Sequence, residues 1–343
     1  MIVNPWSVSA LTVDTLSAGL AAMTLFNATR LLFSTSGKNL PPEGLTKVED
    51  QLYLLFWMGV VLLMLRFLAW PLFYLVLHSF VPEVQGAMCI FGTRNLLPTL
   101  TRSLEILKPL LFFFGIIWLI LFKLERFDSQ HRDSRRGQRN SLILLFLCVI
   151  AAAMDSGASA VLWVKSSAEL AVSCCTTITD IPTRFTVWMP ESLLGPAYNR
   201  PLWISYFVGN GLVIGFSGLV YTKSWTKRFH PFLYLNLALL AVINCSLTVV
   251  AYIEVVAPQL MRLPFHHCLY CMIQKIPDAS FFVGLFALGT CVAAAVLPVY
   301  LMAESWAEKD ALLQSVRKLC ATAVLCLSGS LLMVATHLIM IKV

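Results

Sequence analysis

Residues 52–80, LYLLFWMGVVLLMLRFLAWPLFYLVLHSF, decide the fold class because Arg66 is the one Lys, Arg, Asp or Glu among them. A helix needs about 20 apolar residues to cross the hydrocarbon core of a bilayer. Similar apolar stretches recur along the whole chain, in which 58% of the 343 residues are hydrophobic and 13% are charged. A soluble domain carries about twice that charged fraction. The sequence therefore predicts an all-α integral membrane protein.

Eight stretches are long and apolar enough to form membrane-spanning helices. They cover approximately residues 13–34, 52–80, 101–125, 140–164, 203–223, 231–257, 280–303 and 319–341. No stretch has the composition of a separate soluble domain, so we expect a single polytopic membrane domain over residues 1–343, folded as an eight-helix transmembrane bundle. The first residues, MIVNPWSVSALTVD, have no basic region ahead of an apolar core, so no cleavable signal peptide is expected.

The distribution of Lys and Arg predicts the orientation of this bundle. Of the 25 basic residues, 15 fall in the connections on one side and 8 on the other, while Arg66 and Lys108 lie inside spans. Because the cytoplasmic side carries the excess of positive charge, we expect both termini outside. The net charge of +7 is then an orientation signal, and the lipid bilayer, not nucleic acid, is the expected partner. In a bacterium the membrane would be the inner one.

The expected topology divides the ten cysteines into two groups of five. Five fall inside spans, where cysteine is common as a small apolar core residue: Cys148, Cys245, Cys291, Cys320 and Cys326. The other five fall in three outer connections: Cys89, Cys174, Cys175, Cys268 and Cys271. In a bacterium that side is the periplasm, where disulfides persist. Because five is an odd number, at least one outer cysteine stays a free thiol, binds a ligand or pairs with a partner protein.

The stretch 264–272, PFHHCLYCM, contains a CxxC motif in the outer connection between the spans 231–257 and 280–303. As a redox site, Cys268 would attack and Cys271 would resolve, since the first cysteine of such a motif can have a lowered pKa. Cys174, Cys175 or Cys89 would pass electrons to and from an outer thiol partner, and a quinone would accept them. In this logic the arrangement is similar to the DsbB and vitamin K epoxide reductase families, although length, span count and longer motifs differ.

The same side chains also form a candidate soft-metal site. His266 and His267 with Cys268 and Cys271 offer up to four donors, and Cys174, Cys175 or Cys89 could complete a four-coordinate site. Cysteine and histidine select copper(I) or zinc, and methionine favours copper(I). Further soft donors on this side are Met88, Met261, Met272 and, on one face of the last span, Met333, His337 and Met340.

A third interpretation gives the outer cysteines a purely structural role, with no catalysis and no metal. The connection 165–202 is 38 residues long and contains Pro182, Pro190, Pro196 and Pro201, which suggests an ordered, non-helical outer cap. Disulfides from the outer cysteines would brace it in a non-catalytic membrane subunit. Cys174 and Cys175 are adjacent, so each would need a different partner.

Three charged residues inside the spans form the last candidate group. Counted from the outer ends of their spans, Lys108 and Asp155 lie at similar depths, and Arg66 lies one turn deeper. Charges at this depth are costly and tend to be paired and functional. We expect Asp155 to pair with Arg66 or Lys108, either as a structural ion pair or as part of a proton path or quinone-headgroup site.

Overall fold

The computed structural model describes residues 2–35, 42–128, 135–169, 171–173, 176–181, 184–226 and 230–342. Every regular element in these ranges is a helix, and eight helices are long and apolar enough to cross a membrane. This confirms the all-α, eight-span prediction. Because eight is an even number, we expect both termini on one side of the membrane. Which side that is stays a prediction from the positive charge.

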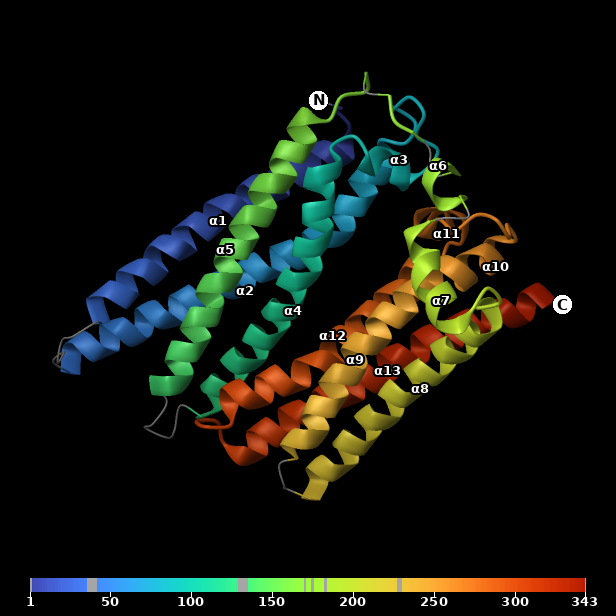
Figure 1. Cartoon of the computed structure of the whole chain (residues 1–343). Coiled ribbons are helices and arrows are strands. Elements are labelled where there is room, and N and C mark those ends of the chain that lie inside the picture. Colours follow the sequence, from blue (N-terminus) through green and yellow to red (C-terminus); the bar gives the residue numbers. More distant parts are fainter. Residues whose placement is uncertain are drawn as a thin grey trace. The chain divides into compact units, whose positions relative to one another are not determined.

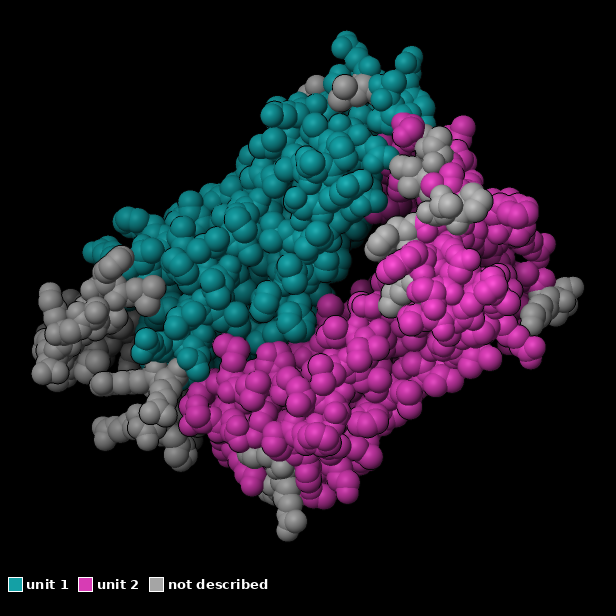
Figure 2. All heavy atoms as spheres, in the orientation of Figure 1, with its two compact units in different colours: residues 1–86, 93–172 teal, residues 87–92, 173–343 magenta. Residues whose placement is uncertain are grey.

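The chain divides into two compact units, coloured separately in Figure 2. Unit 1 comprises residues 1–86 and 93–172, and unit 2 comprises residues 87–92 and 173–343. Each unit contains four of the eight spans. The single polytopic domain expected for residues 1–343 stays a prediction.

Unit 1 is an up-and-down four-helix bundle (Figure 1). Its helices are α1 (Pro5–Thr35), α2 (Pro42–Ser79), α4 (Pro98–Asp128) and α5 (Arg135–Lys165). Helix α1 packs on α2 and α5, and α4 also packs on α5 and α2. The indole nitrogen of Trp118 donates a hydrogen bond to the backbone oxygen of Ser141 at 3.0 Å, which joins α4 to α5 deep in the bundle.

The four long helices of unit 2 pack in the same way, each on the one before and the one after it, and the first on the last. They are α8 (Asn199–Lys223), α9 (Pro231–Ala251), α12 (Ala279–Ala303) and α13 (Lys309–Lys342). Helix α9 continues through a π-helical segment (Tyr252–Val256) into α10 (Ala257–Met261), so the sixth span extends beyond the expected end at 257. Helix α13 begins ten residues before the expected start at 319 because Lys309 and Asp310 form its polar first turn.

The cap, residues 165–202, is partly helical, which corrects the expectation of a non-helical lid. It contains α6 (Thr176–Thr179) and α7 (Phe185–Leu194), with Pro190 inside α7. Val187 and Pro190, three residues apart, are both buried, and α7 packs against α8 and the π-helical segment. The burial of this apolar face outweighs the hydrogen bond that proline removes from the helix.

Candidate functional site

Three cysteine sulfurs meet in unit 2. The Sγ atoms of Cys89, Cys268 and Cys271 all lie within 4.8 Å of one another. Cys89 and Cys268 are each 1% exposed, and Cys271 is partly exposed. The aromatic rings of Phe91 and Tyr270 pack against the group, which we call the cysteine trio. Among the described residues, it is the group of side chains with metal-ligand geometry.

A short helix holds two members of the trio. Cys268 immediately precedes α11 (Leu269–Lys275), and its carbonyl oxygen accepts the first helical hydrogen bond from Met272 at 3.1 Å. Cys271 therefore lies one turn into the helix, and its sulfur can reach that of Cys268. The ammonium of Lys275 donates to the carbonyl oxygen of Met261 at 3.0 Å. This bond fixes α11 to the end of the sixth span.

The third member arrives from a distant segment. Cys89 directly precedes α3 (Ile90–Arg94), and its carbonyl oxygen accepts a hydrogen bond from Gly92 at 2.9 Å. Upstream, Gly86 has φ +82°, and a Cβ there would lie 2.2 Å from the carbonyl oxygen of Val172. Only glycine allows this close approach. The tight turn at Gly86 thus directs the chain from unit 1 to the short segment of unit 2 that carries Cys89.

Both thiols of the CxxC motif have a raised pKa. A hydrogen bond from Cys271 lowers the pKa of Cys268, but the contact with Cys89 and burial outweigh it and raise that pKa to about 11. The hydrogen bonds with Cys268 and Cys89 and burial also raise the pKa of Cys271. The thiol forms of both residues therefore dominate at neutral pH.

The histidines predicted as metal ligands bond to other groups. The imidazole Nδ1 of His266 lies 2.9 Å from Oδ1 of Asp180. The Nδ1 of His267 donates to the carbonyl oxygen of Phe265 at 3.1 Å. Neither histidine belongs to the trio. His337 bonds to the carboxylate of Asp278 through Nε2, at 2.8 and 2.9 Å. Cys174 and Cys175 lie outside the described residues.

A buried carboxylate next to this region was not identified from the sequence. Glu254 lies in the π-helical segment with a fully buried side chain. Arg184, at the start of α7, donates to it from both Nε (3.0 Å) and Nη2, and the hydroxyl of Tyr198 donates at 2.9 Å. The Nε2 of His267 lies 4.0 Å from Oε2 of Glu254. The ion pair fixes the cap to the sixth span, and π-helical turns are frequent at functional sites.

Unit 1 has its own buried polar group. Asp155 accepts hydrogen bonds from Arg66 and from Lys108, whose Nζ lies 2.9 Å from Oδ1. The expected pairing is therefore confirmed, with both cations as partners. Asp14 on α1 adds a second carboxylate, since its Oδ1 accepts from Arg66 at 2.6 Å. The four side chains are each at most 4% exposed. We call them the charge network.

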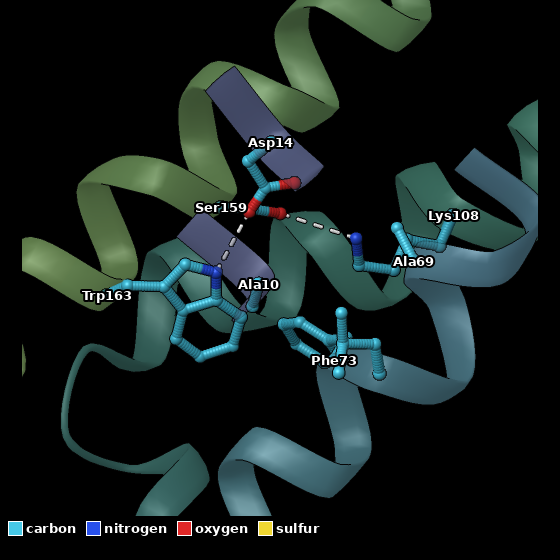
Figure 3. Close-up of a pocket in the computed structure, with 8 residues that line it drawn as sticks. Ala10, Asp14, Ala69, Phe73, Lys108, Ser159 and Trp163 are labelled. Atoms are coloured by element: carbon cyan, nitrogen blue, oxygen red, sulfur yellow. Dashed lines mark hydrogen bonds between the residues drawn. The ribbon is translucent and has the colours of Figure 1, made fainter. Parts of the chain in front are cut away.

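A small pocket adjoins the charge network (Figure 3). Asp14, Lys108, Ser159 and Trp163 supply its polar lining, and Ala10, Ala69, Leu72 and Phe73 supply the rest. The indole nitrogen of Trp163 donates to Oδ2 of Asp14 at 2.9 Å, and Lys108 donates to the hydroxyl of Ser159 at 3.3 Å. Asp14 could have been found from the sequence by the signal that identified Asp155, a lone carboxylate inside an apolar span.

A comparison of the chain with protein-family models, curated proteins and solved structures finds no match.

Proposed function

We propose that this protein is a membrane thiol–disulfide electron carrier whose working group is the cysteine trio. The observation that supports this proposal is the approach of three sulfurs, from two separate segments, to within 4.8 Å of one another. Two cysteines suffice for a structural disulfide. A third within reach allows the disulfide to move by exchange. We place the protein in the bacterial inner membrane, with the trio on the periplasmic side.

Exchange with an outer thiol partner begins at Cys271, the most exposed sulfur of the trio. A thiolate of the reduced partner attacks Sγ of Cys271 in a Cys268–Cys271 disulfide, and Cys268 leaves as the thiolate. Cys268 is the leaving group because it is the other sulfur of the disulfide that is attacked at Cys271. The partner's second thiolate then displaces Cys271 and forms the partner's disulfide. Two electrons now reside on Cys268 and Cys271. This reverses the attacking and resolving roles expected from the motif alone.

The two buried cysteines of the trio, Cys89 and Cys268, exchange electrons with the quinone. A quinone oxidises Cys89 and Cys268 to a disulfide and takes two electrons and two protons to become a quinol. The thiolate of Cys271 then attacks Sγ of Cys268, which restores the Cys268–Cys271 disulfide and releases Cys89 as a thiolate. The proton lost by Cys271 goes to Cys89. Cys174 and Cys175, in the cap sequence, are the proposed outer shuttle.

We propose that the charge network binds or conducts protons and does not bind a quinone. Arg66 and Lys108 both pair with Asp155, and the pocket beside them has room for about one water molecule. A quinone ring needs far more space.

A soft metal ion is the second candidate ligand of the trio. Three sulfurs within 4.8 Å suit a three-coordinate copper(I) ion, or zinc with a fourth ligand from outside the described residues. Cys89, Cys268 and Cys271 would hold the ion as thiolates. Because bound metal replaces the thiol protons, this function predicts a lowered thiol pKa in the loaded protein.

The experiment uses purified protein in lipid nanodiscs. A soluble quinone analogue is added, then dithiothreitol as the reduced dithiol, and alkylation with peptide mass spectrometry reports each cysteine. We expect the quinone to oxidise the trio and the dithiol to reduce it under native conditions. Cys271→Ser should block reduction by the dithiol, and Cys89→Ser should slow oxidation by the quinone. Cys245→Ser, in a span, is the matched control.

Three results would overturn the redox proposal. Copper or zinc bound in stoichiometric amount by the purified protein favours the metal function. A disulfide that reduces only after denaturation favours a structural staple. Thiols that the quinone leaves unchanged, in a folded protein, exclude the quinone as the oxidant.

A further inference from the structure

The two carboxylates of the charge network are held unequally. Asp155 accepts from two cations, Arg66 and Lys108. Asp14 accepts from one cation, Arg66, and from the neutral indole of Trp163. A proton placed on Asp155 would weaken two ion pairs, whereas a proton placed on Asp14 weakens one. Asp14 is therefore the carboxylate with fewer cationic partners in the charge network.

The pocket gives Asp14 room for a neighbouring water molecule. Its space suits about one water molecule, and its polar lining offers the carboxylate of Asp14, the ammonium of Lys108 and the hydroxyl of Ser159. A buried water makes two to four hydrogen bonds, which these groups can supply. The apolar side is formed by Phe73 and Leu72. The ammonium of Lys108 also lies 4.9 Å from the ring centroid of Phe73.

The pocket lies near one end of the bundle of unit 1. Asp14 is nine residues into α1, and Ser159 is six residues before the end of α5. At 1.5 Å per residue these are depths of about 14 Å and 9 Å. The end in question is the one at which α1 begins and α5 finishes, which the positive charge assigns to the outer side. A proton therefore has a short path from the outer water.

We infer that unit 1 contains a proton-binding site in which Asp14 takes up a proton from the outer aqueous phase, relayed by a water molecule in this pocket, and returns it by the same route. On uptake, the proton passes from a hydronium ion to the Asp14 carboxylate, and the network changes from neutral to a charge of +1. Asp14 then loses most of its attraction for Arg66, which keeps its bond to Asp155. The site is independent of the cysteine chemistry.

The groups that face Asp14 come from every helix of unit 1. Arg66 on α2 and Lys108 on α4 favour its ionised form, and Asp155 on α5 opposes it. The indole of Trp163 on α5 adds a neutral hydrogen bond to the ionised form. Occupancy by a proton is set by the balance among these four groups.

The test is infrared spectroscopy of the full chain in lipid nanodiscs as the pH is lowered. We expect a carboxyl C=O band from a buried, protonated acid to grow as the pH falls. The band should be missing in Asp14→Asn and unchanged in Asp278→Asn, a carboxylate of unit 2. A band that persists in Asp14→Asn, or no band at any pH at which the protein stays folded, would overturn the inference.

A second variant covers the case in which Asp14→Asn does not fold. Trp163→Phe removes the indole hydrogen bond to the Asp14 carboxylate and leaves all four charges in place. We expect the midpoint of the carboxyl band to move to a pH about one unit higher, because a donor to the ionised form is lost. The matched control is Trp118→Phe, whose indole bonds to a backbone oxygen. Equal midpoints in the two variants would show that Asp14 does not hold the proton.

Discussion

The sulfur atoms of Cys89 and Cys268 lie within 4.8 Å of each other although 179 positions separate the two residues in the sequence. Such an approach is close enough for a disulfide to form with small side-chain rotations. Mild oxidation of the Cys271→Ser variant with diamide should therefore join Cys89 to Cys268, as shown by non-reducing peptide maps. In Cys89→Ser only the Cys268–Cys271 bond should form. Cys245→Ser should leave the map of the unchanged trio as it is, and a Cys89 that is still fully alkylated after oxidation of Cys271→Ser would contradict the arrangement.

The charge network should show strong coupling between its members. Asp155→Asn leaves Lys108 buried without a carboxylate partner, so we expect a loss of about 3–5 kcal/mol in unfolding free energy. The double variant Asp155→Asn with Lys108→Met keeps the pair of Arg66 and Asp14, and it should be more stable than Asp155→Asn alone. Unfolding in a graded mixture of detergents measures both. Additive losses in the double variant would contradict the pairing.

The cap should lose stability in acid through His267. Burial lowers the pKa of this imidazole below its usual value, so the unfolded state binds a proton more readily than the folded state. Stability is then full above the unfolded pKa of about 6.5 and falls as the pH drops below it. Hydrogen exchange of α7 and α11 amides against pH measures the effect. His267→Phe should flatten the profile, and a profile that is the same with and without this substitution would contradict the role of His267.

The buried ion pair between Arg184 and Glu254 should hold the cap closed. Glu254→Gln leaves the guanidinium of Arg184 without its carboxylate partner, and we expect a local loss of about 3–5 kcal/mol. The readout is faster hydrogen exchange in α7 and faster alkylation of Cys271. Arg184→Lys keeps the charge but loses the two-point contact, so its effect should be smaller. Unchanged exchange in Glu254→Gln would show that α7 is held by packing alone.

The turn at Gly86 should be less tolerant of a side chain than the turn at Gly195. Both residues have φ +82°, but a Cβ on Gly86 would lie 2.2 Å from the carbonyl oxygen of Val172, and a Cβ on Gly195 has open space. Gly195→Ala should cost about 1–3 kcal/mol from backbone strain alone. Gly86→Ala should cost more and should also lower the yield of the Cys89 cross-link. Equal costs would show that the Val172 contact relaxes freely.

The architecture follows from the sequence because span length and charge content are set by the bilayer itself. Residues 52–80 and the seven similar stretches correspond to eight observed helices, with ends that differ by up to ten residues. The ends differ because polar turns such as Lys309–Asp310 can extend a helix beyond the membrane. The helix α7 was missed because Pro182, Pro190 and their neighbours outweigh its apolar face in any local interpretation of the cap.

The sites were only partly predictable. The depth of Arg66, Lys108 and Asp155 along their spans predicted a pairing that the structure confirms. Asp14 and Glu254 carry the same signal, a single carboxylate within an apolar span, and both belong to buried ion pairs. The association of Cys89 with the CxxC motif has no local signal, because it depends on how residues 87–92 join unit 2.

The wide sequence separation within the cysteine trio has a consequence for biogenesis. Cys89 leaves the ribosome 179 residues before Cys268. At about 5–20 residues per second, roughly 9–36 s pass before the CxxC pair is synthesised. Any oxidant that acts on the nascent chain meets Cys89 during this interval. Correct assembly therefore depends on keeping Cys89 reduced until residue 271 has been made and α11 has folded.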